Sequence, residues 1–473
     1  MKKYLKESWQ KEMQIRLDVN NVFVDNIGEE HGISKEDVNQ LADRVKEAHK
    51  NIREANLGFM ELPYNQEQVV QDIKEFAEEN KGKFDNFVVL GIGGSALGNI
   101  ALQTALNDAY HNYRDDRGSA PRLFVPDNID PLRFKSLLDI LDMERTVFNV
   151  ISKSGGTAET MSQYLIARQI VAEEVGEEKV KEHFIATTSQ DSGYLIEIAK
   201  REEYKTFHIP ENVGGRFSVL TAVGLVSAAF TGIDIEALLA GAAYMDKITQ
   251  KEEVWENPAY LNAVLQYIAY ENGKPLSVMM PYSHSLKDLA DWYRQLWAES
   301  LGKELDREGN IVNLGPTPIK ALGATDQHSQ MQLYMEGPYD KFITFLEVEN
   351  YGAEMEMPKL YDDIEGVAYL GGHSLGELLK TEKNATELAL TKRSRLNETI
   401  ILPEVNEFTM GQLLYMLELQ TAVLGELLNI DAFNQPGVEL GKHYAYGVLG
   451  RDGYKDFGEE YDNRPDKDES LIL

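Results

Sequence analysis

The sequence predicts an α/β fold with two parallel sheets, each flanked by helices in a three-layer αβα arrangement. Short apolar runs typical of buried strands alternate with longer stretches of helical periodicity, and polar loops follow several of those runs. This alternation is typical of parallel sheets with helices on both faces. The chain has 473 residues, of which 43% are hydrophobic, enough for two or three domain-sized cores.

The N-terminal 80 residues are predicted to be mostly helical. Apolar residues such as Leu41 and Val45 recur at helical spacing, and Ser34 has the position of an N-cap residue. We therefore expect an N-terminal helical segment over residues 1–60, ahead of the first sheet.

Four buried-strand patterns indicate the first sheet, which we place in a domain spanning residues 61–235. They lie at residues 84–90, 122–126, 147–151 and 183–187, with helical patterns between them, for example at 95–107 and 158–175. Ligands bind to such sheets at the carboxyl ends of the strands. The polar loops 91–98 and 152–157 directly follow strands, so we expect both at the ligand-binding edge.

A second sheet domain, residues 236–445, is expected after an apolar helix at 220–230. Its predicted strands lie at 276–280, 341–348 and 398–402, and its helices include 284–301, 326–335 and 408–428. Residues 305–322 are predicted to form a long loop. Residues 446–473 are charged and turn-rich, which predicts a loosely packed acidic C-terminal tail.

Composition excludes several classes of protein. The chain has no cysteine, so disulfides, thiolate metal sites and a cysteine nucleophile are impossible. Its 78 acidic residues outnumber 47 basic ones, and the net charge of −31 repels nucleic acid and anionic membranes. Solubility or adaptation to salt is the simplest explanation of this acidity. An anionic ligand would therefore need a local pocket of cations and amide donors.

The chain carries no sequence signal for a membrane or for secretion. Residues 220–233 are the most apolar stretch, but they are shorter than the roughly 20 residues of a membrane span and contain Ser, Thr and Gly. The first residues lack an apolar signal region. We expect a cytoplasmic, soluble protein without membrane or nucleic-acid partners.

The glycine-rich loop 91–98 has the composition of an anion-binding turn. Its glycines, with Gly94 and Ser95 at the centre, let backbone N–H groups face a ligand at the start of a helix. The loop also fits a relaxed dinucleotide fingerprint, with Asp127 as the ribose acid, and an ordinary tight turn. We favour contact with a phosphate or a sugar.

The loop 152–157, Ser-Lys-Ser-Gly-Gly-Thr, is a sharper signal. Ser152, Ser154, Thr157 and Lys153 gather at a strand-to-helix turn, where hydroxyls and N–H groups make a phosphate cradle. The loop lacks the Gly-Lys-Ser/Thr ending of a P-loop, which disfavours a nucleoside triphosphate. The alternative is a serine-capped helix.

Two further segments carry charged groups suited to catalysis. A glycine pair at 214–215 precedes Arg216, which offers a fixed cation to an anion or to developing negative charge. Gln295 and Glu299 are four residues apart and share a helix face in apolar surroundings, where a carboxylate can act as a general base. Spacing alone does not distinguish Glu299 from a solvated helix glutamate.

The remaining candidates are weaker when taken singly. His328 is one of nine histidines, and Asp326 is a neighbour that can orient it. Residues 435–442 combine Gln435, two glycines, an acid and Lys442, which is also compatible with a turn and a helix. No His, Asp or Glu cluster has metal-ligand spacing, so no metal site is expected.

The loops 91–98 and 152–157, the segment around Arg216 and residues 435–442 occur in the same order as in the phosphoglucose isomerase family. Together they resemble that family from about residue 80 to residue 442. The segments 211–218 and 433–442 are similar to its two best sequence signatures, and 152–157 resembles the phosphate loop of sugar isomerase domains. The resemblance implies two sugar isomerase domains and a homodimer. It also implies interconversion of glucose 6-phosphate and fructose 6-phosphate without metal or organic cofactor.

The resemblance also assigns roles to single residues. The phosphate would be bound by Ser152, Ser154 and Thr157, with Lys153 in the same loop, and the sugar site would be lined by Gly94, Ser95, Gln295 and Gln435. Glu299 would move a proton between C2 and C1, and Arg216 would stabilise the enediolate. His328, supplied by the other subunit, and Lys442 would help to open and close the sugar ring.

Elementary chemistry agrees with this assignment. Aldose–ketose isomerisation needs one base that holds and returns a proton, and positive charge near the reacting oxygens.

A non-catalytic phosphosugar-binding regulator would not need Arg216, Glu299 and Lys442 together. A glutamine-cleaving aminosugar-phosphate synthase would need a cysteine, and a nicotinamide dehydrogenase would use the loop 91–98. The predicted loop 305–322 is longer than the family pattern leads us to expect, which leaves the rim of the site and the dimer contacts open.

Overall fold

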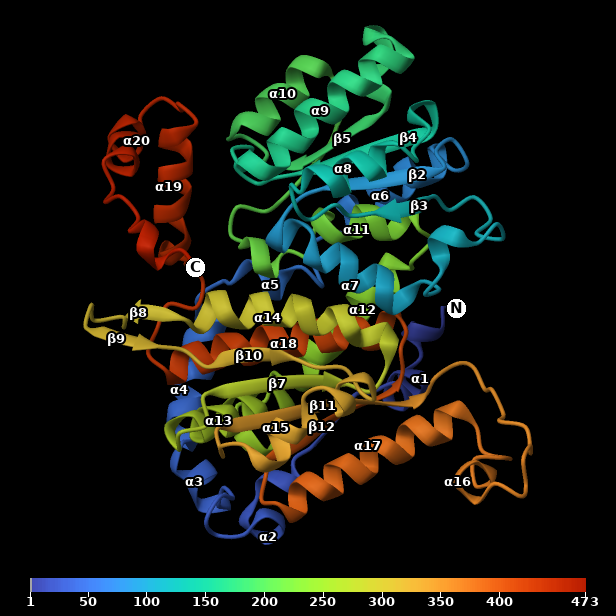
Figure 1. Cartoon of the computed structure of the whole chain (residues 1–473), viewed down its shortest axis with the longest axis vertical. Helices are drawn as coiled ribbons and strands as arrows, with labels where there is room; N and C mark the ends of the chain where they lie inside the picture. The colour runs from blue at the N-terminus through green and yellow to red at the C-terminus, as the bar shows by residue number, and fades with distance from the viewer. Residues whose placement is uncertain (1) are drawn as a thin grey trace.

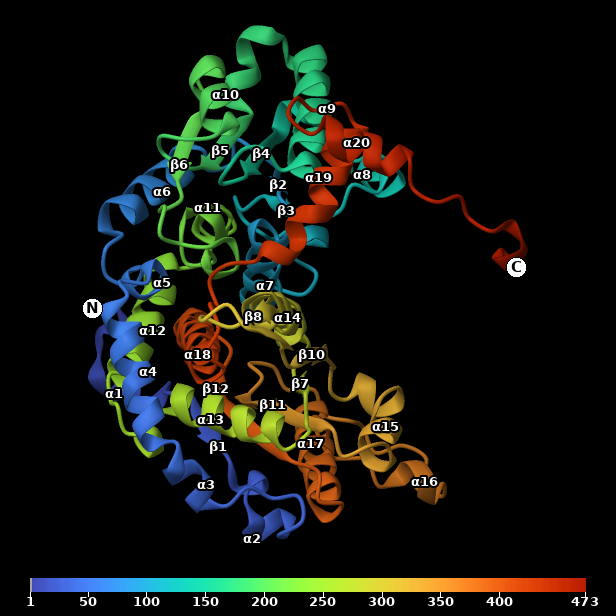
Figure 2. The same ribbon diagram turned by 90° about the vertical axis from the view of Figure 1, so that its left-hand side faces the viewer.

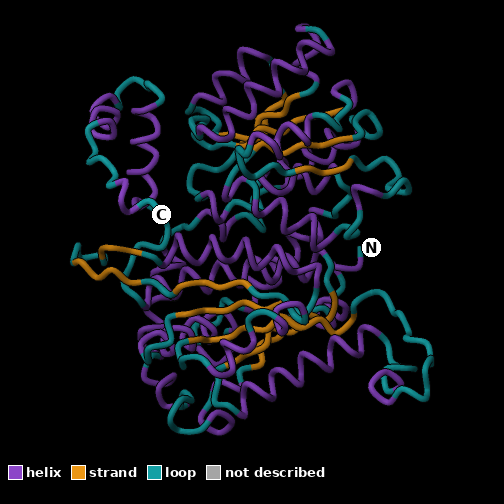
Figure 3. Tube along the Cα trace, in the orientation of Figure 1, coloured by secondary structure: helices purple, strands orange, loops and turns teal. Residues whose placement is uncertain are grey.

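Two five-stranded sheets organise the chain, and a layer of helices separates them (Figures 1 and 3). The computed structural model describes residues 2–473. The α/β architecture with parallel sheets flanked by helices confirms the predicted fold class.

The first sheet is wholly parallel, with the order β3-β2-β4-β5-β6. Its strands are β2 (Asn86–Leu90), β3 (Arg122–Phe124), β4 (Thr146–Ile151), β5 (Phe184–Thr188) and β6 (Lys205–His208). Every residue of β2, β4 and β5 is buried, which explains why these strands read as continuous apolar runs. Strand β6 was not predicted, because it is an edge strand that is half polar and partly exposed.

Helices cover both faces of this sheet because successive strand side chains point to opposite sides. On one face, Val88 and Phe148 pack against α8 (Pro131–Leu138), α9 (Ala158–Val175) and α10 (Tyr194–Glu202). On the other, Phe87 and Val147 pack against α6 (Glu67–Glu79), α7 (Leu97–Leu106) and α11 (Ala222–Phe230). This is the predicted three-layer arrangement.

The second sheet has the order β1-β12-β11-β7-β10. Parallel pairing joins β7 (Leu276–Pro281), β10 (Thr317–Lys320), β11 (Lys341–Asn350) and β12 (Asn397–Glu404), whereas β1 (Arg16–Asp18) is antiparallel to β12. One face packs on α13 (Pro258–Glu271) and α18 (Glu407–Leu427), and the other on α15 (Met331–Glu336) and α17 (Leu375–Lys392).

One prediction about this region is wrong. Residues 305–322 are not a simple loop: β8 (Lys303–Leu305) and β9 (Ile311–Leu314) form a hairpin, and β10 adds an edge strand to the sheet. The N-terminal segment is mostly helical, as predicted, and in addition its short strand β1 joins the opposite edge of the sheet. All four strands are short and lie at an edge or in a hairpin, where little burial is needed and a proline such as Pro318 is tolerated.

Helices α12 (Ile235–Ile248) and α18 pack side by side in the middle layer (Figures 1 and 2). A side-chain carbon on Gly241 would lie 2.0 Å from the Phe408 carbonyl oxygen, and one on Gly411 would lie 1.9 Å from that of Leu238. Only glycine permits this approach of the two backbones. Although α18 is almost entirely buried, no helix in residues 2–473 is long and apolar enough to span a membrane.

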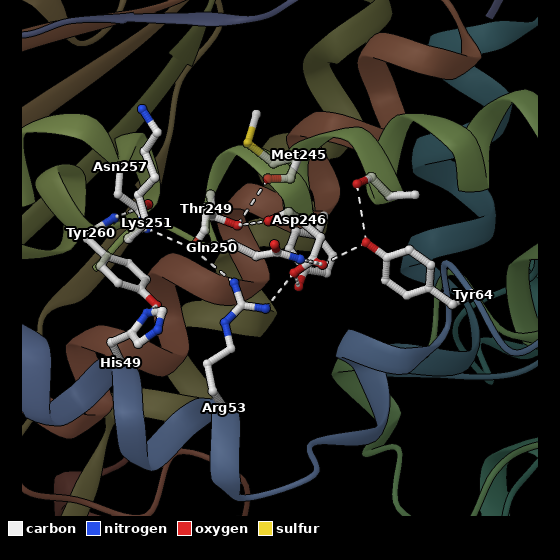
Figure 4. Close-up of polar contacts among 12 residues, drawn as sticks. His49, Arg53, Tyr64, Met245, Asp246, Thr249, Gln250, Lys251, Asn257 and Tyr260 are labelled. Atoms are coloured by element: carbon white, nitrogen blue, oxygen red, sulfur yellow. Dashed lines mark hydrogen bonds and ion pairs between the residues drawn. The ribbon is translucent and has the colours of Figure 1, made fainter. Parts of the chain in front are cut away.

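A buried ion pair fastens the N-terminal helices to this middle layer (Figure 4). Arg53, on α4 (Ala42–Glu54), donates to the Asp246 carboxylate of α12 at 2.6 Å. Tyr64 and Tyr415 also donate to that carboxylate. These contacts lower the pKa of Asp246, although burial opposes the shift.

Shorter helices complete the N-terminal region: α1 (Glu7–Glu12), α2 (Val24–Ile27), α3 (Lys35–Gln40) and α5 (Gly58–Glu61).

The C-terminal segment forms a helical hairpin of α19 (Glu439–Val448) and α20 (Lys455–Asp462). Gly447 and Gly458 lie in contact, so the two helices pack closely. The expectation of a loosely packed tail is therefore wrong for residues 455–462, while the chain beyond α20 extends away from the body (Figure 2).

Helix α14 (Lys287–Leu301) lies beside α7, and α16 (Glu365–Ala368) lies in the long connection between β11 and α17.

Candidate active site

Loops at the carboxyl end of the first sheet meet helix α14 and the segment that precedes α19. The turn η3 (Gly93–Ser95) follows β2, and the turn η7 (Gly215–Phe217) carries Arg216. A side-chain carbon on Gly94 would lie 2.2 Å from the Gly215 carbonyl oxygen. The absence of a side chain at Gly94 therefore lets the loop of the first strand press against the arginine turn.

The loop 152–157 connects β4 to α9, and its hydroxyls form hydrogen bonds within the loop. Ser152 is buried, and its Oγ lies 3.1 Å from Thr157 Oγ1 and accepts from the Gly155 N–H at 3.0 Å. Ser154 Oγ accepts from the Gly156 N–H at 3.2 Å. Thr157 is the N-cap residue of the 18-residue helix α9, yet its hydroxyl makes no capping bond. The first N–H groups of α9 and three hydroxyls are therefore grouped at one helix N-terminus, as an anion site requires.

Lys153 belongs to this loop but its ammonium group points elsewhere. Its Nζ donates to the carbonyl oxygens of Glu211 and Val213, at 2.7 and 3.2 Å. Lys153 thus ties the loop to the chain that leads into the arginine turn, rather than offering a free cation inside the loop.

Arg216 is a buried cation that joins three parts of the chain. Its side chain is 2% exposed, and burial lowers its pKa from the ordinary arginine value. Nε donates to Ser300 Oγ at 2.7 Å and Nη1 to Gln435 Oε1 at 2.8 Å. Nη2 donates to the carbonyl oxygens of Ala432 and Asn434. The guanidinium group therefore fixes the segment that carries Gln435 against α14.

Glu299 lies beside this cation. Its Oε2 is 3.6 Å from Arg216 Nη1, and its Oε1 accepts from Gln295 Nε2 at 3.0 Å. The side chain is 32% exposed, so the carboxylate faces a solvent-accessible space. Gln295 Oε1 is buried and has no hydrogen-bond partner, which leaves an acceptor for a ligand hydroxyl. A carboxylate, an amide and a fixed cation are thus adjacent.

Two residues that the sequence analysis did not single out complete this cluster. Ser300 holds Arg216, and Lys303 Nζ donates to the Glu299 carbonyl oxygen at 2.6 Å. Burial, together with the nearby Arg216 charge, lowers the pKa of Lys303 to about 8. The signal available in the sequence was only that both residues follow Glu299 within four positions.

His328 and Lys442 do not join the cluster within a single chain. His328 ends the turn η10 (Thr325–His328), and no hydrogen bond or ion pair in residues 2–473 connects it to Glu299 or to Arg216. Asp326 does not orient it, because that carboxylate accepts from the Leu322 N–H and the Ser329 hydroxyl. Lys442 is exposed on α19 and pairs with Glu439 at 2.8 Å.

Within residues 2–473, no group of three or more His, Asp or Glu side chains is placed to hold a metal ion. A cavity of about 360 Å³ lies between α6 and the start of α12, and none of the predicted site residues lines it. Two of its lysines, Lys2 and Lys74, are neutralised by Glu236.

Comparisons with known proteins identify the family of the chain. The family model described as phosphoglucose isomerase matches residues 58–463. A protein of Carboxydothermus hydrogenoformans named glucose-6-phosphate isomerase is 49% identical over 453 residues, which cover 95% of this chain and 97% of that protein. A protein of Rubrobacter xylanophilus with the same name is 42% identical, covering 90% of this chain and 96% of that protein.

Solved structures show the same similarity. A hypothetical protein from Thermus thermophilus superposes with a TM-score of 0.82 and 35% identity, covering 92% of this chain and 100% of that one. A glucose-6-phosphate isomerase from Chlamydia trachomatis superposes with a TM-score of 0.70 and 27% identity, covering 83% and 76% of the two chains. The similarity thus extends over most of the chain.

Proposed function

The chain belongs to the phosphoglucose isomerase family of aldose–ketose isomerases, and from this premise we propose that it interconverts D-glucose 6-phosphate and D-fructose 6-phosphate. The observation that carries the proposal is the placement of Glu299 between the Gln295 amide and the buried Arg216. A non-catalytic phosphosugar-binding regulator would have no use for this arrangement.

Glu299 acts as the base in the proposed reaction. Its carboxylate removes the proton from C2 of the open-chain aldose and returns it to C1, or the reverse, so one group holds the proton throughout. Arg216 stabilises the negative charge of the enediolate that forms between these steps. Because the cation is buried and fixed by four hydrogen bonds, little reorganisation is needed when that charge develops.

The phosphate group binds at the loop 152–157 in this proposal. Ser152, Ser154 and Thr157 supply hydroxyls, and the N-terminus of α9 supplies backbone N–H groups. Gly94, Ser95, Gln295 and Gln435 lie around the sugar, as the η3 turn packs on η7 and Gln435 packs on Arg216. Binding energy from the phosphate positions C1 and C2 beside Glu299.

His328 and Lys442 handle ring opening and closing. The lack of contact between His328 and the Glu299 cluster of its own chain favours a homodimer in which each subunit supplies this histidine to the other. Lys442 lies on α19, and its exposed ammonium group can exchange Glu439 for a sugar oxygen. We further propose a cytoplasmic location, independence of metal ions and cofactors, and the domain division at residues 60, 235 and 445.

The first test is conversion of fructose 6-phosphate, with glucose 6-phosphate detected by a coupled dehydrogenase, in the presence of chelator and without added cofactor. Glu299→Gln should lower kcat by roughly 10²- to 10⁴-fold and leave phosphosugar binding nearly intact. Glu304→Gln is the matched control, because Glu304 is an exposed carboxylate on the neighbouring strand.

Two outcomes would contradict the proposal. Turnover of the Glu299→Gln variant within a few-fold of the wild type would show that Glu299 is not the base. Phosphosugar binding without any conversion by the wild type would favour the regulator.

A further inference from the structure

Arg451, in the turn between α19 and α20, has no acidic partner. No carboxylate in residues 2–473 forms an ion pair with its guanidinium group, although acidic residues outnumber basic ones by 78 to 47. The group instead lies among the rings of Tyr194, Tyr446 and Tyr454, at 5.7, 4.3 and 5.3 Å from their centres. Contact with the Tyr194 hydroxyl raises the pKa of Arg451, so this cation remains charged.

The guanidinium group lies against the loop 152–157. A side-chain carbon on Gly156 would be 3.8 Å from Arg451 Nη2 and 3.5 Å from the Tyr194 ring. The Tyr446 hydroxyl donates to the Gly156 carbonyl oxygen at 3.4 Å. The C-terminal hairpin therefore contacts the candidate phosphate loop through Arg451 and through Tyr446.

The other side of the loop is fixed by the start of α10. The Tyr194 N–H donates to the Ser154 carbonyl oxygen at 3.0 Å, and a side-chain carbon on Gly193 would lie 2.4 Å from that same oxygen. Tyr194 thus touches the loop through its backbone and Arg451 through its ring. This places the arginine at a defined position beside the loop.

The loop itself lacks a free cation. The Lys153 ammonium group is engaged by two carbonyl oxygens of the 211–213 segment, so the loop offers hydroxyls and N–H groups only. A sugar phosphate carries a charge of about −1.5 to −2 near pH 7. In a protein of net charge −31, such a group needs a nearby positive charge. Arginine suits this task because its planar fork matches phosphate oxygens.

We propose that Arg451 is a further phosphate-binding residue, brought to the loop 152–157 by the C-terminal hairpin. The inference rests on the proposed function, since it concerns the phosphate of the same substrate. It assigns to the hairpin a role in substrate binding, in addition to carrying Lys442.

The test compares Arg451→Gln with Arg464→Gln. Arg464 lies in the same C-terminal segment and also stacks on a tyrosine, Tyr461 at 4.0 Å. Arg464→Gln thus removes an equal charge without touching the loop. The measurements are KM for fructose 6-phosphate, inhibition by inorganic phosphate, inhibition by the uncharged polyol sorbitol, and the rise in Tm that inorganic phosphate produces.

Arg451→Gln should raise KM and the phosphate inhibition constant by roughly 10- to 100-fold, because a charge-assisted contact is lost. kcat and the sorbitol inhibition constant should change by less than about threefold, and Arg464→Gln should behave as the wild type. Arg451→Lys, which keeps the charge but not the fork, should fall between them. If the Gln variant does not fold, Arg451→Lys still tests the proposal, with a several-fold rise in the phosphate inhibition constant expected.

Three results would overturn the inference. One is an unchanged phosphate inhibition constant and Tm response in the variants. Another is equal weakening of phosphate and sorbitol, which indicates a displaced hairpin instead of a lost phosphate contact. The third is a fall in kcat with KM unchanged. Failure of the proposed function is distinguishable, because the wild type would then bind phosphate, as its Tm rise reports, without converting fructose 6-phosphate.

Discussion

Replacement of Arg216 by lysine tests whether catalysis needs the shape of this cation as well as its charge. The guanidinium group makes hydrogen bonds in three directions, to Ser300, to Gln435 and to the carbonyl oxygens of Ala432 and Asn434. A lysine ammonium group carries its donors on one atom and cannot reach all of these acceptors. At least two of them lose their donor in the variant Arg216→Lys.

The magnitude follows from these contacts. Each buried acceptor left without a donor costs about 1–3 kcal/mol, so the loss of two donors should lower the free energy of unfolding by about 2–6 kcal/mol. The enediolate loses one preorganised donor, for which kcat typically falls about 10²- to 10³-fold. KM should change by less than about fivefold, because the loop 152–157 is untouched.

The assay is the coupled conversion of fructose 6-phosphate, combined with thermal unfolding. Arg294→Lys is the control, because Arg294 lies on the same helix α14 but is half exposed and pairs only with Asp291. A kcat of the Arg216→Lys variant within tenfold of the wild type would refute the reasoning, since charge alone would then suffice.

Three further predictions concern binding and stability. Ser152→Ala combined with Thr157→Ala should raise KM for fructose 6-phosphate at least about tenfold, since hydrogen bonds to a charged ligand are lost; a pure kcat effect in steady-state kinetics would contradict the phosphate loop. Arg53→Met should lower the free energy of unfolding in urea by about 3 kcal/mol, because the Asp246 carboxylate stays buried without its cation; a loss below about 1 kcal/mol would contradict this. Burial raises the pKa of Glu398 to about 8, above its ordinary value of 4.5. This side chain therefore contributes stability that is complete below pH 4.5 and is lost as the pH rises through 8. Glu398→Gln should flatten the fall in unfolding free energy between pH 5 and pH 8, and an unchanged slope would show that Glu398 does not cause it.

The central strands could be predicted from the sequence because a strand that is buried on both faces consists mainly of apolar residues. All five residues of β2 and all six of β4 are buried, so each reads as a short apolar run between turn signals. The edge strands β1, β6 and β10 have no such apolar run. They have three or four residues and are partly exposed, and only the strand beside each one stabilises it.

The site was predictable in its loops but not in its contacts. Glycines and hydroxyls at strand ends follow from local chemistry, so the loops 91–98 and 152–157 could be found. The direction of Lys153 could not, because it depends on carbonyl oxygens about 60 residues away. Ser300 and Arg451 were missed for the same reason: Arg216 and Tyr194, which they contact, come from distant segments.

The long-range hydrogen bonds of Arg216 also affect when the site can form during synthesis of the chain. Its guanidinium group holds carbonyl oxygens 216 and 218 residues later in the chain, and α19, with Lys442, follows directly. During synthesis the first sheet can form on the ribosome long before these acceptors emerge, because domains of large proteins fold as units and in order. Arg216 therefore stays hydrated and without its carbonyl partners until residues 432–434 have left the ribosome. A chain that ends before residue 432 contains most of both cores but lacks these acceptors, so the segment that carries Gln435 cannot be fixed beside α14 until that point of synthesis.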